Sequence, residues 1–181
     1  MRILMALSAT ALAALLIQQP ALAASSGTID CPLRAMSTNS QATYATALID
    51  DADAGKTMDS ARAFVTPLAE SCGKAGRWSF ERVQNAISWT LWSLMTVRLL
   101  AETGMTAADA AILRTYYDQH TVQLEGMMEY SAAQRSQLIG ELRRLGAHLH
   151  DDGSKASEQE LTIILLAQQM RHEEAGFAAL K

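Results

Sequence analysis

No segment of the chain shows the sustained alternation of apolar and polar residues that is typical of a half-buried strand. Almost every segment instead carries residues that favour the start or the end of a helix. The pattern predicts helices over about residues 40–54, 58–72, 80–103, 106–129, 131–150 and 157 to nearly 181. The connections between the last helices are short, so we expect neighbouring helices to pack antiparallel. The expected fold is an all-α, single-domain bundle of five to six helices.

The helix expected at 80–103 carries apolar residues in all directions around its axis, which indicates burial on most sides. These residues are Ile87, Trp89, Leu91, Trp92, Leu94, Met95, Val97, Leu99 and Leu100. Ser79 can cap the start of this helix, and Gly104 can close its end. The apolar window covers only 86–101 and includes Arg98, so it is too short and too polar for a membrane span. We expect this helix at the centre of the bundle.

Three of the expected helices begin with a capping box, in which two side chains satisfy backbone N–H groups of the first turn. The boxes are Thr106-x-x-Asp109, Ser131-x-x-Gln134 and Ser157-x-x-Glu160. Pro67 lies inside the second expected helix and removes a backbone N–H there. We expect Pro67 to kink that helix or to restart it, with Thr66 as the new N-cap.

Residues 1–23 have the features of a secretory signal peptide. A positive start at Arg2 precedes an apolar run from Ile3 to Ile17, which is too short for a membrane anchor. Ala21-Leu22-Ala23 then places small side chains at both positions that a signal peptidase reads. We predict cleavage after Ala23, a periplasmic or secreted location, and a mature helical domain of residues 24–181.

Both cysteines, Cys31 and Cys72, lie in the part of the chain expected to be exported, where thiols oxidise. A bond between them would connect the N-terminal segment to the end of the second helix. Closing such a loop stabilises a fold by roughly 3 to 4 kcal/mol in the chain-entropy model. A redox-active pair would favour a Cys-x-x-Cys spacing, which the chain lacks. We therefore predict a structural disulfide.

The formal net charge is −4, and neither sign dominates any long stretch of the chain. No cluster of Lys and Arg suited to tracking phosphates is present, so we expect no nucleic-acid partner. After signal cleavage we expect a protein that is not embedded in a membrane. A domain of this length can bury enough surface to fold without a bound metal, and we predict no cofactor.

His120 is the most prominent candidate for ligand chemistry, because it lies on an apolar stripe of the helix expected at 106–129. The stripe contains Leu113, Tyr116, Tyr117, Leu124, Met127 and Met128. A buried histidine is most often a core residue with a ring nitrogen bonded to a carbonyl or hydroxyl group. The alternative is a metal, haem or small-molecule carrier with its site around His120. Covalently bound haem is excluded, because no Cys-x-x-Cys-His occurs.

Arg98 is a cation on the most apolar helix, where burial without a partner would cost several kcal/mol. Either it pairs with a carboxylate such as Glu102, or its stem covers apolar surface while its head group reaches water. If Arg98 faces a cavity, it is the best anchor for an anionic ligand. The walls of that pocket would be Trp89, Trp92, Tyr116 and Tyr117.

His148, His150, Asp151 and Asp152 have the composition of a metal site at the end of the helix expected at 131–150. Positions two apart on a helix point to different faces, so the two histidines could not share an ion there. A histidine near a helix C-terminus is favoured by the helix dipole in any case. We therefore expect a solvated helix end and no metal ligands.

No catalytic motif in the chain supports an enzyme. The zinc-protease pattern that starts at His172 fails at Gly176, where a second histidine is required. Ser71 to Lys74 matches Ser-x-x-Lys without the companion motifs of penicillin-recognising enzymes. The leading hypothesis is an exported bundle that binds an envelope protein or a small molecule. A cell-envelope hydrolase with a site built from distant residues is a further alternative.

Overall fold

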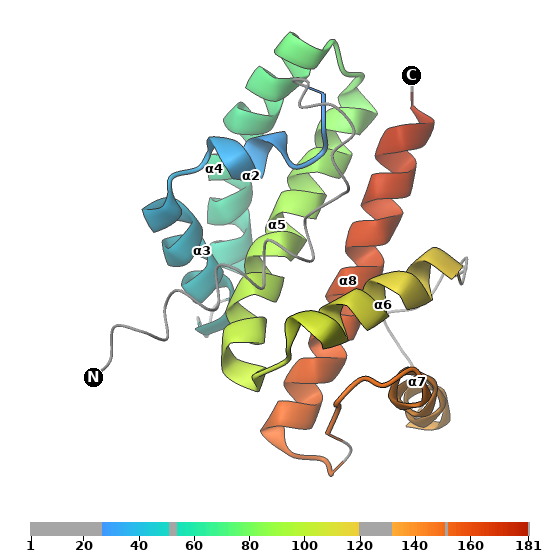
Figure 1. Cartoon of the computed structure of the whole chain (residues 1–181). Helices are drawn as coiled ribbons and strands as arrows, with labels where there is room; N and C mark the ends of the chain where they lie inside the picture. Colours follow the sequence, from blue (N-terminus) through green and yellow to red (C-terminus); the bar gives the residue numbers. More distant parts are fainter. Residues whose placement is uncertain (1–26, 51–53, 120–131, 151, 181) are drawn as a thin grey trace.

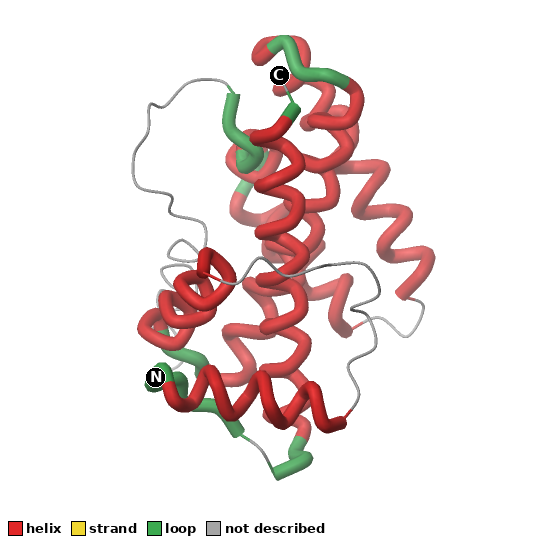
Figure 2. Tube along the Cα trace, turned by 90° about the vertical axis from the view of Figure 1, so that its right-hand side faces the viewer, coloured by secondary structure: helices red, strands yellow, loops and turns green. Residues whose placement is uncertain are grey.

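The computed structural model describes residues 27–50, 54–119, 132–150 and 152–180. Within these ranges the chain forms seven α-helices and no β-strand (Figure 1; Figure 2). The helices are α2 Cys31–Ala35, α3 Thr38–Asp50, α4 Ala54–Gly76, α5 Phe80–Thr103, α6 Ala107–Gln119, α7 Ala132–Arg144 and α8 Lys155–Ala179. The expected all-α bundle is confirmed, and α2 is a short helix that the sequence did not predict. The signal segment, His120 and the box at Ser131 lie outside the described residues.

α5 is the centre of the bundle and contacts α2, α3, α4 and α8 (Figure 1). Its bounds are those predicted. The Ser79 hydroxyl accepts a hydrogen bond from the N–H of Arg82 at 3.3 Å. Gly104 ends the helix with a φ of 72°, a left-handed conformation that favours glycine. None of the described helices, α5 included, has the length and apolar character needed to cross a bilayer.

α5 and α8 run antiparallel along the molecule and carry two hydrophobic clusters (Figure 1). The first half of α5, with Trp89, packs with α2, α3, α4 and the second half of α8 around Phe177. The second half of α5, with Leu99, packs with α6, α7 and the first half of α8 around Ile163. Trp92 packs against both clusters. The two long helices therefore join the clusters into one core.

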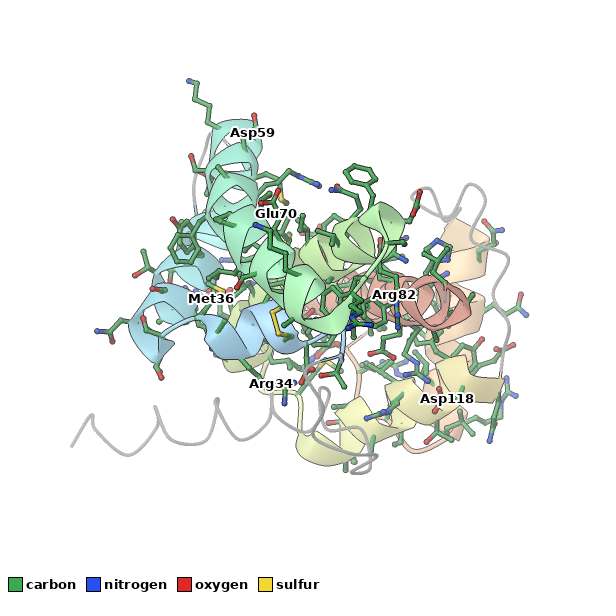
Figure 3. The ribbon with its side chains drawn as sticks, turned by 90° about the horizontal axis from the view of Figure 1, so that it is seen from above. Arg34, Met36, Asp59, Glu70, Arg82 and Asp118 are labelled. Carbon is green, nitrogen blue, oxygen red and sulfur yellow. A yellow bond between two sulfur atoms is a disulfide. The ribbon has the colours of Figure 1, made fainter. Side chains whose placement is uncertain are left out.

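The predicted disulfide between Cys31 and Cys72 is present and joins α2 to α4 (Figure 3). The two Cα atoms lie 6.2 Å apart. Pro32 and Leu33 of α2 are buried against the bundle. A helix of five residues is too short to be stable on its own, so the disulfide and these buried side chains hold α2 in place.

α4 is continuous across Pro67, so the predicted restart at Thr66 is wrong. The Thr66 hydroxyl donates to the carbonyl of Arg62 at 2.7 Å, one turn back, and does not cap a new helix. Ala63 and Pro67 are both exposed. The carbonyl of Ala63, which loses its backbone donor at Pro67, can therefore be hydrated, and the helix continues.

α7 ends at Arg144, earlier than predicted, because a glycine turn follows it. Gly146 has a φ of 97°, and the N–H of Ala147 donates to the carbonyl of Leu142 at 3.0 Å. Together these features form a Schellman motif, which satisfies the last carbonyls of a helix. Residues 147–150, which we call the strap, are not helical and lead toward α8.

α8 begins at Lys155, so the capping box predicted at Ser157 and Glu160 is wrong. The N-cap is Ser154, whose hydroxyl accepts a hydrogen bond from the N–H of Ser157 at 3.2 Å. The helix begins one turn earlier than predicted because the Ser154 hydroxyl can cap it there. Ser157 consequently lies inside the helix and is buried.

Candidate functional site

α6 crosses α8 in the fold (Figure 1). Side chains of these two helices and of α5 line a cleft. The lining residues come from all three helices and are Thr96, Arg114, Tyr117, Ala167, Met170, Arg171 and Glu174. Together with its open mouth the cleft measures about 340 Å³. Most of this space is open to solvent, and the enclosed part, about 20 Å³, has room for about one water molecule, so a ligand would lie mainly in the open mouth.

The floor of the cleft is apolar because its polar atoms bond to other partners. Met170 is buried, and its sulfur lies 3.8 Å from the hydroxyl of Thr96. The Thr96 hydroxyl donates to the backbone carbonyl of Trp92 at 2.8 Å. The Tyr117 hydroxyl donates to the carbonyl of Ile164 at 3.1 Å. The floor therefore presents a thioether, a methyl group and an aromatic ring.

Charged side chains surround the mouth of the cleft. Arg171 on α8 pairs with Asp118 on α6, which is labelled in Figure 3, and with Glu174 further along α8. Glu174 also accepts a hydrogen bond from the indole N–H of Trp89 at 3.0 Å. Arg114 on α6 contributes a second guanidinium group. The cleft thus combines an apolar floor with two cations and nearby carboxylates.

The aromatic residues predicted as pocket walls are only partly brought together. Tyr117 lines the cleft, whereas Trp89 is buried and donates a hydrogen bond to the lining residue Glu174. Tyr116 packs edge-on against Tyr117, with ring centroids 5.4 Å apart. Trp92 packs between the two hydrophobic clusters and is not among the lining residues.

Arg98, the predicted anchor, lies away from the cleft. It makes ion pairs with Asp50 at 3.2 Å and with Glu102 at 2.6 Å, and 29 % of its side chain is exposed. The predicted partner is therefore present, and the head group also reaches the surface. The cations that line the cleft, Arg114 and Arg171, were missed because the helices that carry them meet only in the tertiary fold.

A second cluster of polar groups lies where the strap meets α6 and α8. The Asp109 carboxylate accepts a hydrogen bond from the backbone N–H of His148 at 2.8 Å and lies 3.2 Å from its Nδ1. The Glu160 carboxylate repeats this arrangement with the N–H and Nδ1 of His150, both at 2.6 Å. Both carboxylates are buried. Each therefore holds one histidine of the strap in the same way.

Thr106 completes the surroundings of Asp109 and confirms the predicted capping box. Its N–H and hydroxyl donate to the carboxylate at 2.8 and 2.6 Å, and its hydroxyl accepts from the Asp109 N–H at 3.2 Å. Burial alone would raise the pKa of Asp109, but hydrogen bonds from His148 and Thr106 outweigh burial and lower the pKa. A hydrogen bond to Glu160, together with its charge, raises the pKa of His150.

Glu173 on α8 is a carboxyl group with altered proton affinity. Burial raises the pKa of Glu173 to about 7, and the charge of Arg62 opposes this rise. The side-chain amide of Asn85 contacts α8 through both of its polar atoms. Its nitrogen donates to the Glu173 carboxylate at 3.2 Å, and its oxygen accepts from the backbone N–H of Phe177 at 3.0 Å. Glu173 therefore exchanges its proton near neutral pH.

In the described part of the chain, no three or more His, Cys, Asp or Glu side chains are grouped so as to hold a metal ion. No protein family, curated protein or solved structure matches this chain. The chemistry of the cleft is thus the basis for assigning a function.

Proposed function

We propose that this protein is an exported binding protein that holds a small amphipathic anion in the cleft between α5, α6 and α8. The observation that supports this function is an apolar floor next to two guanidinium groups, those of Arg114 and Arg171. The floor formed by Ala167 and Met170 favours burial of an apolar body. Guanidinium groups favour a carboxylate, sulfonate or phosphate head group.

Two features support a periplasmic or secreted location. Residues 1–23 have the pattern of a signal peptide. The disulfide between Cys31 and Cys72 fits an oxidising compartment, because thiols are kept reduced in the cytosol.

The exposed apolar residues favour a small ligand over a protein partner. Among the described residues, the large hydrophobic side chains with high exposure are Phe80 at 72 % and Leu145 at 51 %. They lie at opposite ends of the molecule, at the start of α5 and after α7 (Figure 1). An exposed apolar patch of more than a few hundred Å² is a common mark of a docking surface for a protein. Two separate side chains do not form one.

The two guanidinium groups and the two carboxylates at the mouth balance in charge, so the cleft suits a ligand with at most a single negative group. Asp118 and Glu174 lie beside the guanidinium of Arg171, so a second negative group on the ligand would meet their carboxylates. Because Trp89 bonds to Glu174, binding of a head group at the mouth should also alter the fluorescence of this indole.

Calorimetric titration of the exported protein with sodium decanoate tests the proposal. Decanoate joins an apolar chain to one carboxylate, and decyltrimethylammonium carries the same chain with the opposite charge. We expect one decanoate per protein, bound at least about tenfold more tightly than the cation, which corresponds to roughly 1.4 kcal/mol. Equal affinity for the two amphiphiles would exclude the guanidinium groups as determinants.

A pair of arginine variants locates the binding site. Arg114→Gln should weaken decanoate binding about tenfold, because a hydrogen bond between charged groups contributes about 1.5 to 3 kcal/mol. Arg144→Gln, at an exposed position in the last turn of α7, should bind as the natural chain does. If Arg114→Gln retains full affinity, the cleft is not the site.

A further inference from the structure

The strap joins α7 to α8 (Figure 1) and carries two histidines, His148 and His150, at alternate positions. Ala147 and Leu149 are buried, whereas the side chains of His148 and His150 are 86 % and 53 % exposed. Alternate burial of this kind is typical of an extended chain, in which residues two apart point to the same side. The alternation therefore indicates that both imidazoles lie on the exposed side of the strap.

Each imidazole is held at one nitrogen by a buried carboxylate. Nδ1 of His148 lies 3.2 Å from Asp109, and Nδ1 of His150 lies 2.6 Å from Glu160. The two acidic side chains are 1 % and 3 % exposed. An ionised carboxylate only accepts hydrogen bonds, so Nδ1 carries the hydrogen and the lone pair of the neutral ring lies at Nε2.

A carboxylate bonded to Nδ1 is the usual outer partner of a metal-binding histidine, because it fixes the tautomer and the ring orientation. A single pair of this kind would be an ordinary surface contact. Here the same arrangement occurs twice on alternate residues, with carboxylates from two different helices, α6 and α8. Each carboxylate also binds the backbone N–H of its own histidine, so the fold itself sets the position of both rings.

We propose that His148 and His150 form a surface site for a divalent transition-metal ion, bound through both Nε2 atoms with water at the other positions. Imidazole nitrogen favours Cu²⁺, Ni²⁺ and Zn²⁺, and Cu²⁺ binds most tightly of the three. Ca²⁺ prefers oxygen ligands and is not expected here. Asp109 and Glu160 are positioning residues. The site is separate from the cleft and does not depend on the proposed anion.

Titration of the full exported chain with CuCl₂, with glycine as a competing ligand, tests this site. We expect one Cu²⁺ per chain and an electron paramagnetic resonance spectrum with coupling to two imidazole nitrogens. His148→Gln and His150→Gln should each weaken Cu²⁺ binding at least about tenfold and remove one nitrogen from the spectrum. CaCl₂ should produce no binding signal.

His172→Gln is the matched control, because His172 is an exposed histidine on α8 outside the strap. Its affinity for Cu²⁺ should equal that of the natural chain. Asp109→Asn tests the positioning role and should weaken Cu²⁺ binding about tenfold while His148 and His150 remain. If this variant loses helix content by circular dichroism, the exposed histidine variants still decide the question. The proposal is overturned if either strap variant binds Cu²⁺ as tightly as the natural chain, or if His172→Gln weakens binding as much.

Discussion

Glu173 illustrates how packing on α8 changes the chemistry of a single carboxyl group. Burial raises its pKa from 4.5 to about 7, so the folded protein keeps a proton that the unfolded chain has already lost. Between these two pH values the folded state binds more protons than the unfolded state. The free energy of unfolding therefore falls as pH rises through this range.

Glu173→Gln should be more stable than the natural chain at about pH 8, because the amide cannot ionise. We expect a gain of about 1 kcal/mol, which is less than the full pKa shift implies because the side chain is only half-buried. Near pH 4.5 the two proteins should be about equally stable. Urea unfolding over this pH range measures the difference. Glu70→Gln on α4, an exposed position labelled in Figure 3, is the control, and a gain that does not grow with pH would contradict the prediction.

At the scale of residues, the sequence allowed prediction of contacts that depend on one segment and few others. The box of Thr106 and Asp109 is local, and the structure contains it. Glu160 fits a box equally well, yet its partner is His150, which a helical reading of the strap placed elsewhere. Nothing in the sequence indicated that Met170 lines the cleft, because an apolar residue on an apolar helix does not show which neighbour it faces.

The turn at Gly146 determines where α7 ends. Its φ of 97° is unfavourable for a residue with a Cβ atom. A Cβ atom there would only touch the Ile112 side chain at 3.8 Å, so the cost of a substitution comes from the backbone and not from a steric clash. Gly146→Ala should therefore lower the free energy of unfolding by roughly 1 to 2 kcal/mol. Gly140 lies inside α7, and a Cβ atom there would meet no other atom within 4 Å. Gly140→Ala should therefore raise the free energy of unfolding by up to about 1 kcal/mol. Urea unfolding of both variants should give opposite signs, and equal signs would be inconsistent with this helix end.

The disulfide determines whether α2 stays on the bundle. Cys31 and Cys72 are separated by 41 residues, and opening a loop of that length should cost about 4 kcal/mol in the chain-entropy model. Dithiothreitol should therefore lower the melting temperature of the natural chain to that of the double variant Cys31→Ser/Cys72→Ser. The double variant should not respond to dithiothreitol. A natural chain that melts equally with and without reductant would show that the bond contributes little.

At the scale of elements, prediction succeeded where several signals agree. For α5 the cap at Ser79, the stop at Gly104 and the apolar run all indicate the same bounds. For α7 the signals conflict, because the apolar residues of the strap continue the helical pattern beyond Gly146. For α4 the sequence shows Pro67 but not its exposure, and exposure is what lets the helix continue.

The whole molecule should unfold as one unit, because α5 and α8 each run through both hydrophobic clusters. Trp78 and Trp89 pack in the cluster that contains α2, α3 and α4, and Trp92 packs against both clusters. Tryptophan fluorescence therefore reports mainly on that cluster, whereas far-ultraviolet circular dichroism reports on all helices. The two signals should have the same urea midpoint. Two separate midpoints would mean that the clusters are independent.

At the scale of the molecule, helical periodicity and capping were sufficient to predict the fold class. The cleft could not be predicted in the same way, because it needs side chains from α5, α6 and α8 at one crossing point. A sequence shows that each helix buries a face, but it does not show which faces meet. Arg114 and Arg171 are consequently ordinary helix residues until the three helices are assembled.

The dependence of α5 on α8 has a consequence for how the polypeptide is made. The ribosome completes α5 well before α8, which begins only at Lys155. During that interval the nascent chain exposes an apolar helix that lacks its main cover, and this surface is a natural target for chaperones. The same delay keeps the nascent chain incompletely folded until α8 emerges, which fits the export that we propose.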